Sequence, residues 1–279
     1  MNYIEIKAPA KINIGLNILS KREDGYHNLS TLFYPINDLH DILTFERSDK
    51  FEFYCDSESI PSDSSNLVVK AKNLLELVTK RKIDVKISLS KNIPSQAGLG
   101  GGSSDAAATL LSLNEMFNLG LEYVQLIDLA LQLGSDVPFF IKAKPAIGTS
   151  RGEILKHIEL EIHRPILIIN PHINISTKEA FNNISPSNQK FNYETAIKNS
   201  ELNYFDLRLN LKNDFEKYVF EKYPEIAAIK TLLYREGALL SLMSGSGSTV
   251  FGIFPDLVTA ESAIKSLPNE YFIFISHPN

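Results

Sequence analysis

The residues best suited to chemistry lie in one glycine-rich segment, Pro94 to Ala107, which has the sequence P-S-Q-A-G-L-G-G-G-S-S-D-A-A. Four of the five residues from Gly98 to Gly102 are glycines, and Ser103 and Ser104 follow them. A backbone with few side chains can approach a ligand closely, and the first N–H groups of a helix have no partner within that helix. Such groups bind anions well, so the segment predicts a cradle for phosphate.

The cradle is flanked by the elements that must position it. Upstream, apolar residues alternate with polar ones as in a half-buried strand: Ile83, Val85, Ile87 and Leu89. Downstream, the stretch from Ala106 to Phe117 predicts a buried helix, which Ser103 or Ser104 could cap. The alternative is a tight turn, but one or two glycines would satisfy a turn. A Walker A motif is excluded because no Gly-Lys-Ser/Thr follows the glycines, and the dinucleotide-binding pattern fails because Ser103 stands where its last glycine should be.

Two polar residues near the N-terminus, Lys11 and Asn13, lie within an apolar strand pattern. The apolar residues of that pattern are Ile12, Ile14, Leu16 and Ile18. Because side chains alternate across a strand, Lys11 and Asn13 are predicted on the same face. An ordinary strand-face lysine is the alternative. A lysine among apolar and small residues is nevertheless suited to offset the charge of a transferred phosphoryl group.

A carboxylate suited to act as a base is Asp136, in the sequence G-S-D-V-P. Pro138 disfavours a continuing helix and the preceding Gly-Ser pair makes a sharp turn, so the carboxylate could be held at a cleft. An Asx-turn or a helix cap is the alternative. A lysine within a few ångström would keep Asp136 ionised, which makes Lys11 and Asp136 a candidate pair.

A second segment of glycine and serine, Met243 to Thr249, has the sequence M-S-G-S-G-S-T between two apolar runs. Such a turn can close over a phosphate or a substrate, or it can serve only as the connection of a β-hairpin. Both interpretations stay open from this segment alone.

Composition excludes several classes of function. The 279 residues are 44% hydrophobic, which suffices for one large domain or two intimate lobes. A net charge of −5 argues against a broad nucleic-acid surface, and neither a leader nor an apolar run of about 18 residues is present. The single cysteine, Cys55, cannot form an internal disulfide and is predicted as a strand residue rather than a nucleophile. We therefore expect a cytoplasmic protein that binds neither nucleic acid nor membrane.

The remaining chain mixes strands and helices in runs rather than in strict alternation, which favours an α+β fold. Strand patterns cover Tyr3–Leu19, Leu29–Ile36, Asp41–Arg47, Phe51–Cys55 and Ile166–Asn170. Helical patterns cover Asn66–Lys80, Thr177–Asn182, Asp214–Tyr223 and Pro224–Glu236, with two more helical segments between the cradle and Leu133. Residues 182–203 are rich in Asn and Ser, which predicts a surface insertion.

Five motifs taken together resemble the GHMP kinases. The cradle is similar to the pattern P-x-x-x-G-L-G-S/G-S-S-A of that superfamily, with Gly101 and Gly102 extending the glycine run and Asp105 preceding the alanines. The other motifs are P-A-K-I-N, D-G-Y-H, L-G-S-D-V-P-F-F and S-G-S-G-S-T, and all five fall within residues 8 to 254. The resemblance implies a two-lobed α+β fold, with an N-terminal nucleotide-binding lobe of mixed sheet and helices at residues 1–155 and a C-terminal α/β substrate lobe at residues 156–279.

The resemblance also implies an enzyme that uses ATP and Mg²⁺ to phosphorylate an alcohol. The motif D-G-Y-H makes the chain similar to the branch whose small-molecule substrate is a cytidine diphosphate-linked methylerythritol, in the non-mevalonate route to isoprenoids. In that branch the positions of Lys11 and Asp136 form the catalytic pair. Asp136 would take the proton from the 2-hydroxyl group, while Lys11 would orient and stabilise the reacting groups. A homodimer is left open.

Binding residues implied by the resemblance fall into two groups. Tyr26 and His27 would hold the cytosine ring, Phe181 would be the opposite stacking face, and Asn13 would lie near the erythritol and pyrophosphate. The residues expected at ATP are Pro94, Gly98, Leu99, Gly100, Gly101, Gly102, Ser103, Ser104, Asn66 and Lys91. Taken alone, Asn66 could be a helix cap, Lys91 a surface lysine, and the Tyr-His pair structural. No carboxylate cluster predicts a metal site, so nucleotide oxygens and water are expected to hold Mg²⁺.

One stretch departs from the family pattern. Residues Ala146 to Leu155 read A-I-G-T-S-R-G-E-I-L, where the family commonly ends in G-x-G-E, so Ser150 and Arg151 replace the first glycine and the variable position. Other hypotheses are a GHMP kinase for a different small alcohol, a related decarboxylase, and a nucleotide-binding sensor without chemistry. Intact Lys11 and Asp136 argue against the sensor. The Tyr-His pair argues against the decarboxylase, which should need cations for its carboxylate substrate.

Overall fold

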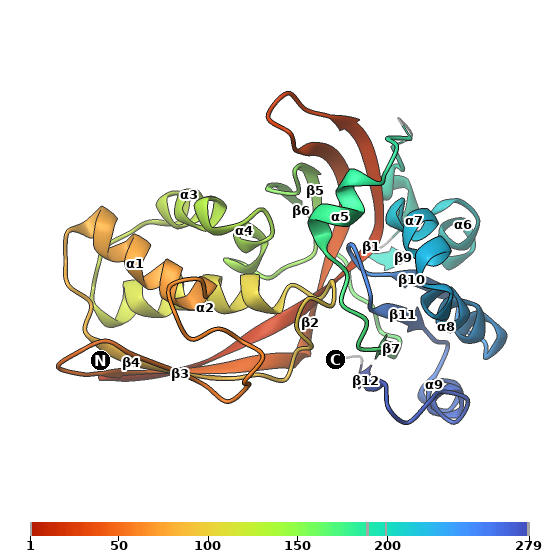
Figure 1. Cartoon of the computed structure of the whole chain (residues 1–279). Helices are drawn as coiled ribbons and strands as arrows, with labels where there is room; N and C mark the ends of the chain where they lie inside the picture. Colours follow the sequence, from red (N-terminus) through yellow and green to blue (C-terminus); the bar gives the residue numbers. More distant parts are fainter. Residues whose placement is uncertain (1, 188–189, 199, 278–279) are drawn as a thin grey trace. The chain divides into compact units, whose positions relative to one another are not determined.

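The computed structural model describes residues 2–187, 190–198 and 200–277 (Figure 1). The chain divides into two compact units. Unit 1 takes its described residues from Met1–Ala10, Leu39–Ser95 and Gly100–Ala143, and unit 2 takes its own from Lys11–Asp38, Gln96–Leu99 and Lys144–Asn279. Each unit is therefore formed by segments that are not contiguous in the sequence. The predicted boundary between residues 155 and 156 follows chain order instead, and it stays a prediction.

Unit 1 is a layer of strands with helices on one face (Figure 1). Its strands are the N-terminal part of β1 (Tyr3–Lys21), the C-terminal part of β2 (His27–Arg47), β3 (Glu52–Cys55) and β4 (Val85–Ser90). Its helices are α1 (Leu67–Thr79), α2 (Gly101–Met116), α3 (Tyr123–Leu133) and α4 (Val137–Phe140). Strand β4 pairs antiparallel with β2 and parallel with β3. Its apolar residues are buried and Lys86 is exposed, which confirms the predicted alternation.

Unit 2 contains a four-stranded antiparallel sheet in the order β10-β11-β7-β12. These strands are β7 (Ile166–Asn170), β10 (Leu240–Met243), β11 (Val250–Ile253) and β12 (Phe272–Ser276). The unit also holds β5 (Ala146–Ser150) and β6 (Ile154–His157), and β5 pairs antiparallel with both β6 and the first part of β2.

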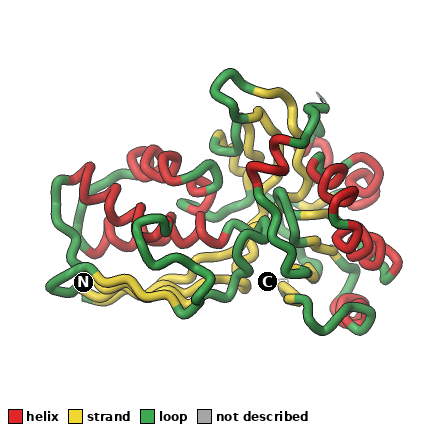
Figure 2. Tube along the Cα trace, viewed as in Figure 1, coloured by secondary structure: helices red, strands yellow, loops and turns green. Residues whose placement is uncertain are grey.

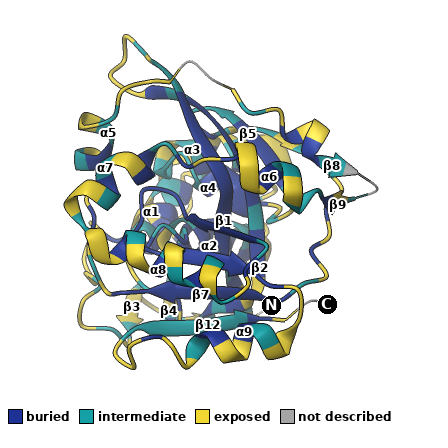
Figure 3. Ribbon diagram, turned by 90° about the vertical axis from the view of Figure 1, so that its right-hand side faces the viewer, coloured by how far each residue is buried: buried dark blue, intermediate teal, exposed yellow. Residues whose placement is uncertain are grey.

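The helices of unit 2 are α5 (Thr177–Asn182), α6 (Tyr204–Asn210), α7 (Phe215–Lys222), α8 (Pro224–Arg235) and α9 (Leu257–Ile264). Figure 2 shows α6, α7 and α8 gathered on one side of the four-stranded sheet. Strand residues Leu167 and Ile169 share a buried core with Val219 of α7 and Leu233 of α8. In Figure 3 the buried parts of the ribbon are dark blue. Burial of such apolar side chains is the main source of stability for this unit. The mixture of strands and helices confirms the predicted α+β class.

Helix α2 begins earlier than predicted. Gly100, at φ 74°, is its N-cap, so Gly101 and Gly102 are helical residues rather than parts of a turn. The idea that Ser103 or Ser104 caps the helix is wrong, because both serines lie inside the first turn and the cap makes no side-chain hydrogen bond. A left-handed cap position favours glycine, which explains why the glycine run extends to this point.

The predicted surface insertion at residues 182–203 is wrong in part. Its described residues include a 3₁₀ helix, η1 (Tyr193–Ala196), and two short strands, β8 (Ile197–Lys198) and β9 (Glu201–Leu202). Tyr193 is only 2% exposed, and its hydroxyl group donates to the Ser30 carbonyl oxygen at 3.3 Å. The segment is therefore anchored in unit 2 by an aromatic side chain. Residues 188, 189 and 199 lie outside the described part of the chain.

Candidate active site

Lys11, on β1, lies at the centre of a buried network in unit 2. Lys11 is only 2% exposed, so the interpretation as an ordinary strand-face lysine is wrong. The Lys11 Nζ donates to Asn13 Oδ1 at 2.6 Å and to the Gly98 carbonyl oxygen at 2.9 Å. A buried ammonium must find such acceptors, because it has lost its water. The two contacts fix the direction of its charge.

Asn13 is held just as firmly. Its Nδ2 donates to Thr31 Oγ1 at 2.9 Å, and the Thr31 hydroxyl in turn donates to the Gly15 carbonyl oxygen at 2.6 Å. These contacts require the Asn13 amide to turn its oxygen toward Lys11 and its nitrogen toward Thr31. The structure thus brings together two predicted site residues, and it adds Thr31, which no motif had singled out.

The M-S-G-S-G-S-T segment approaches the cradle at Gly98. It connects β10 to β11, so it is a hairpin connection. Ser244 Oγ donates to the Gly98 carbonyl oxygen at 2.9 Å, and the Asn13 N–H donates to Ser244 Oγ at 3.2 Å. A Cβ atom on Gly98, whose φ is +77°, would lie 2.1 Å from the Ser244 carbonyl oxygen. Only glycine allows this approach, which places the hairpin connection beside the Lys11 ammonium.

The N-terminus of α2, in unit 1, is suited to bind phosphate. The backbone N–H groups of Gly101, Gly102 and Ser103 open the helix and have no carbonyl partner within it. Ser104 Oγ is buried and has no hydrogen-bond partner among the described residues. A buried hydroxyl without a partner is costly, and a phosphate oxygen would satisfy it. The residues present therefore fit a phosphate group.

Lys91 is not a surface lysine. Its Nζ forms ion pairs with Asp41 and with Asp105, the latter at 3.0 Å, and all three side chains are buried. Burial alone would lower the pKa of Lys91, but Asp105 and Asp41 outweigh it and raise that pKa. Burial raises the pKa of Asp105 to about 7, although Lys91 opposes the shift. Asp105 lies in α2, so the cluster joins the end of β4 to the helix behind the cradle, while the expected place of Lys91 near adenine stays a prediction.

Asn66 is the N-cap of α1, which confirms the alternative that this residue caps a helix. Its Oδ1 accepts the Val68 N–H at 2.8 Å, and its Nδ2 donates to the Pro61 carbonyl oxygen at 2.8 Å. Both ends of the side-chain amide are thus used within the protein. Contact with ATP stays a prediction for this residue.

Asp136 occupies the N-cap position of α4, but its carboxylate makes no capping hydrogen bond to that helix. The alternative that its side chain caps a helix is therefore not borne out for α4. Asp136 belongs to unit 1 and Lys11 to unit 2, and their catalytic pairing stays a prediction.

The predicted nucleobase residues lie on the β1–β2 hairpin and on α5, which Figure 1 shows beside it. The His27 ring stacks on Phe181, with ring centroids 5.2 Å apart and planes at 21°. A base held between these two rings would need them roughly 7 Å apart, twice an ordinary carbon contact, so the rings must part to admit it. Burial and then the Lys21 charge lower the pKa of His27, which favours the neutral ring.

Tyr26 is 52% exposed, and the Arg151 guanidinium lies over its ring at 4.7 Å from the centroid. Ser150, at the departure from the family pattern, has a φ of 62°, in the region that favours glycine. Its hydroxyl accepts from Arg22 Nη1 at 3.0 Å and donates to Glu153 Oε1 at 2.9 Å. Side-chain hydrogen bonds thus hold the loop in the backbone conformation that glycine would adopt, which settles the conformation that the sequence left open.

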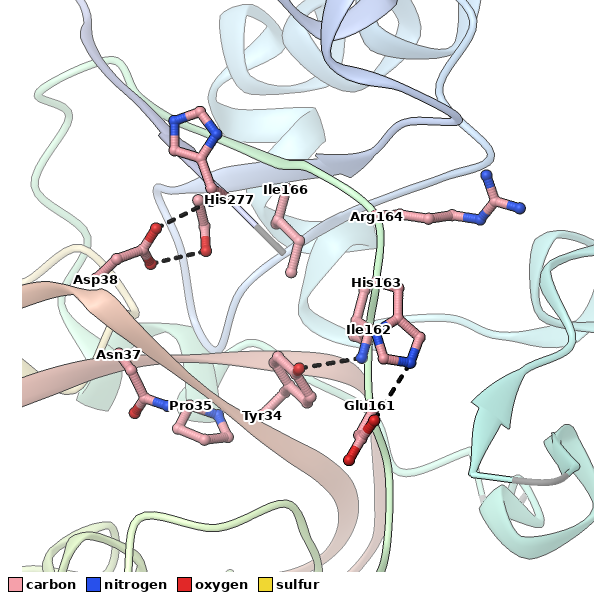
Figure 4. Close-up of a pocket in the computed structure, with 11 residues that line it drawn as sticks. Tyr34, Pro35, Asn37, Asp38, Glu161, Ile162, His163, Arg164, Ile166 and His277 are labelled. Carbon is pink, nitrogen blue, oxygen red and sulfur yellow. Dashed lines mark hydrogen bonds and ion pairs between the residues drawn. The ribbon is translucent and has the colours of Figure 1, made fainter. Parts of the chain in front are cut away.

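A separate pocket of about 260 Å³ lies elsewhere in unit 2 (Figure 4). Of the described residues that line it, none is a predicted site residue. The Asp38 carboxylate there accepts from the Ser276 hydroxyl at 2.7 Å and the His277 N–H at 2.9 Å, and the Tyr34 hydroxyl accepts from the Ile162 N–H. Because these polar groups already have partners, we assign the pocket no role.

Within residues 2–187, 190–198 and 200–277 there is no group of three or more His, Cys, Asp or Glu side chains that could hold a metal ion. The same residues contain no helix that is long and apolar enough to cross a membrane. Burial raises the pKa of the Cys55 thiol, which disfavours the reactive thiolate form.

Comparisons with known proteins agree with the motifs. The sequence profile of the GHMP kinases N terminal domain matches residues 66–144, and that of the GHMP kinases C terminal domain matches residues 190–273. The chain is 40% identical to the 4-diphosphocytidyl-2-C-methyl-D-erythritol kinase of Thermoanaerobacter pseudethanolicus, over 99% of this chain and 96% of that protein. It is 45% identical to the kinase of the same name from Bacteroides thetaiotaomicron, over 88% and 90% of the two chains.

Solved structures show the same relationship. A crystal structure of 4-(cytidine 5'-diphospho)-2C-methyl-D-erythritol kinase superimposes with a TM-score of 0.81 at 32% identity and covers 98% of both chains. A homoserine kinase from Cytophaga hutchinsonii has a TM-score of 0.75 at 19% identity, over 100% of this chain and 96% of that chain, which shows a shared fold alone. The chain therefore belongs to the GHMP kinases, in the family of the 4-diphosphocytidyl-2-C-methyl-D-erythritol kinases.

Proposed function

We propose that this chain phosphorylates the 2-hydroxyl group of 4-diphosphocytidyl-2-C-methyl-D-erythritol with ATP, giving the 2-phosphate and ADP. The observation that carries the proposal is the buried Lys11 ammonium, held at 2.6 Å by Asn13 and at 2.9 Å by Gly98 of the glycine-rich segment. A fixed cation held by the glycine-rich segment suits phosphoryl transfer, since that reaction depends on positioning and on stabilising charge. The family membership supplies the substrate.

In the proposed reaction, the oxygen of the substrate's 2-hydroxyl group forms a bond to the γ-phosphorus of ATP. Asp136 accepts the proton that this hydroxyl group loses. The bond between that phosphorus and the β,γ-bridging oxygen breaks, and its electron pair leaves with ADP. Lys11 offsets the negative charge on the transferred group and orients Asn13. A carboxylate such as that of Asp136 suits the role of base because it can accept a proton from a hydroxyl group within hydrogen-bond reach.

The ATP phosphates are proposed to lie on the first turn of α2, where the Ser104 hydroxyl would gain the partner that it lacks within the described chain. The proposal extends to the other residues of the cradle and to Asn66 and Lys91. Mg²⁺ would be held by nucleotide oxygens and water, and it would supply further positive charge at the phosphates.

The substrate is proposed to bind through Asn13, Tyr26, His27 and Phe181, with the cytosine ring on the exposed Tyr26 and the His27–Phe181 pair. Aromatic faces suit a nucleobase because they offer a broad contact at little entropic cost. A net charge of −5 and a single cysteine fit a cytoplasmic enzyme that acts on a small molecule rather than on nucleic acid.

An assay of ADP release with Mg-ATP and four acceptors tests this function. The acceptors are the cytidyl compound, mevalonate, homoserine and galactose. Selective release with the cytidyl compound supports the proposal. Release with only another acceptor would keep the assignment as a kinase and reject the proposed nucleobase site. ATP binding without turnover on any acceptor would favour a nucleotide sensor.

A further inference from the structure

The hairpin connection beside Lys11 is held from behind by two buried side chains. Asn213, which is 2% exposed, donates through Nδ2 to the carbonyl oxygens of Met243 and Gly245, each at 2.7 Å. Its Oδ1 accepts the Phe215 N–H at 3.0 Å, so both ends of the amide have partners. These contacts fix the carbonyl groups on either side of Ser244.

The Glu216 side chain holds the same stretch by accepting a hydrogen bond from the Met243 N–H group. This residue of α7 is 9% exposed, and its Oε1 accepts the Met243 N–H at 2.9 Å. Its Oε2 forms an ion pair with Lys230 of α8 at 2.6 Å. Burial raises the pKa of Glu216, and Lys230 opposes that shift. The N–H and C=O groups of Met243 are therefore both bound by side chains that precede and open α7.

The path from these side chains to the reacting groups is short. Ser244 follows Met243, and its hydroxyl donates to the Gly98 carbonyl oxygen at 2.9 Å. That carbonyl oxygen also accepts from Lys11 Nζ at 2.9 Å. The Asn13 N–H donates to Ser244 Oγ as well. A shift of Ser244 would thus disturb both groups that hold the Lys11 ammonium.

The residues around Asn213 brace β1 too. Asp214 Oδ2 accepts the Ile18 N–H at 2.7 Å, and the Asp214 N–H donates to the Leu16 carbonyl oxygen at 2.8 Å. Strand β1 carries Lys11 and Asn13. The segment from 212 to 216 is therefore hydrogen-bonded both to the hairpin connection, which carries Ser244, and to β1, which carries Lys11 and Asn13.

We infer that Asn213 and Glu216 are positioning residues for phosphoryl transfer: they set the place of Ser244, and through it the orientation of Gly98, Asn13 and Lys11. The inference rests on the proposed function. Neither side chain touches Lys11 in the contacts described above, so each acts through the backbone of Met243–Gly245. Small misplacements of a catalytic group cost on the order of 10²-fold in rate, so loss of this support should appear in kcat.

The test compares four variants of the full chain. Asn213→Ala removes the two donors, and Glu216→Leu removes the acceptor for the Met243 N–H. Glu216→Gln keeps one acceptor oxygen for the Met243 N–H and replaces the charged oxygen that faces Lys230 with an NH₂ group. Ile229→Val, in the buried core of unit 2 that also contains Met243, is the control for a loss of packing that removes no hydrogen bond to the hairpin connection.

We expect Asn213→Ala and Glu216→Leu to lower kcat roughly 10- to 100-fold with KM for ATP within about threefold of wild type. Glu216→Gln should restore kcat to within about threefold, and Ile229→Val should leave it unchanged. Full kcat in folded Asn213→Ala and Glu216→Leu would overturn the inference. An equal loss of kcat in Ile229→Val at the same melting temperature would overturn it as well, because stability alone would then explain the effect.

Amide hydrogen exchange provides a readout that does not depend on turnover. Exchange across Ser244–Thr249 should be at least about tenfold faster in Asn213→Ala than in wild type or Glu216→Gln. Unchanged exchange would overturn the inference even if Glu216→Leu fails to fold. If the wild type turns over none of the acceptors, the proposed function and the catalytic role of these residues both fail. Faster exchange in Asn213→Ala would in that case show only that these residues support the hairpin connection.

Discussion

Replacing Lys11 by Met is the perturbation that examines the candidate site most sharply. Methionine has a similar length and fills the same space without the charge, so the change removes the ammonium and little else. The loss has two parts. Asn13 Oδ1 and the Gly98 carbonyl oxygen lose a donor, and the transferred phosphoryl group loses a fixed cation.

The magnitudes separate these two parts. The Gly98 carbonyl oxygen keeps the Ser244 hydroxyl as a donor, so the main loss is at Asn13 Oδ1. A buried acceptor that loses its donor costs on the order of 1–3 kcal/mol, but removing a buried ammonium also removes its desolvation penalty, which acts in the opposite direction. We therefore expect a net change in unfolding free energy of no more than about 2 kcal/mol. Removing a preorganised donor from a developing charge typically costs about 3–4 kcal/mol, or roughly 10²- to 10³-fold in kcat. Activity should fall far more than stability.

The assay is steady-state ADP release with the cytidyl substrate, alongside urea unfolding of the same preparations. Lys7→Met is the matched control, because Lys7 is an exposed lysine on the same strand and its loss should leave kcat unchanged. If Lys11→Met kept kcat within about threefold of wild type, the assignment of Lys11 to charge stabilisation would be wrong. A kcat loss that merely follows the fraction unfolded would contradict it too.

Three further outcomes follow from the structure. Asp136→Asn should abolish turnover while calorimetry shows ATP binding nearly unchanged, and retained turnover would remove Asp136 from the role of base. Gly98→Ala should lower kcat and the melting temperature together, because the new Cβ would meet the Ser244 carbonyl oxygen at 2.1 Å and a positive φ costs about 1–2 kcal/mol; an active variant of normal stability would show that the two segments can separate. Burial raises the pKa of Asp105 to about 7, so its proton stabilises the fold below about pH 4 and this contribution is lost as the pH rises through 7, at about 1.4 kcal/mol per unit of pKa shift. Asp105→Asn should therefore flatten the unfolding free energy between pH 4 and pH 7, and an unchanged slope from urea titrations would assign the titration to another group.

Local patterns predicted most elements of the fold. The strands and helices follow periods of two and 3.6 residues, which are visible in the sequence because one face of each is buried. Thr177–Asn182 has the predicted bounds, and Pro224–Glu236 differs from α8 by one residue. The beginning of α2 was missed because glycine is a poor helix former, and only the left-handed φ of Gly100 shows where the helix starts.

Part of the site was also predictable from local sequence. Lys11 stood out because a lysine within an apolar strand is unusual, although its catalytic role was expected only from the family resemblance, and the structure shows that it is buried. The buried partners of Lys91 were not predictable, because Asp41 lies 50 residues away and only the fold brings the two together. Tyr193 was missed for the same reason, as a single buried aromatic in a polar segment has no periodic pattern.

Asn213 and Glu216 show the limit most clearly. Neither residue type nor spacing marks them, since a helix that begins with polar residues normally has them at the surface. Their importance depends on hydrogen bonds to the backbone of residues about 30 positions later. Because the partners are backbone groups, which every residue type carries, the residue types at positions 243 and 245 give no sign of these contacts.

The most direct test of the central claim is the phosphorus NMR spectrum of a reaction that contains the wild-type chain, Mg-ATP and 4-diphosphocytidyl-2-C-methyl-D-erythritol. The account predicts one new phosphomonoester signal that grows in step with ADP while the diphosphate signals of the cytidyl compound persist. Appearance of inorganic phosphate with an unchanged acceptor, or no consumption of ATP, would contradict it.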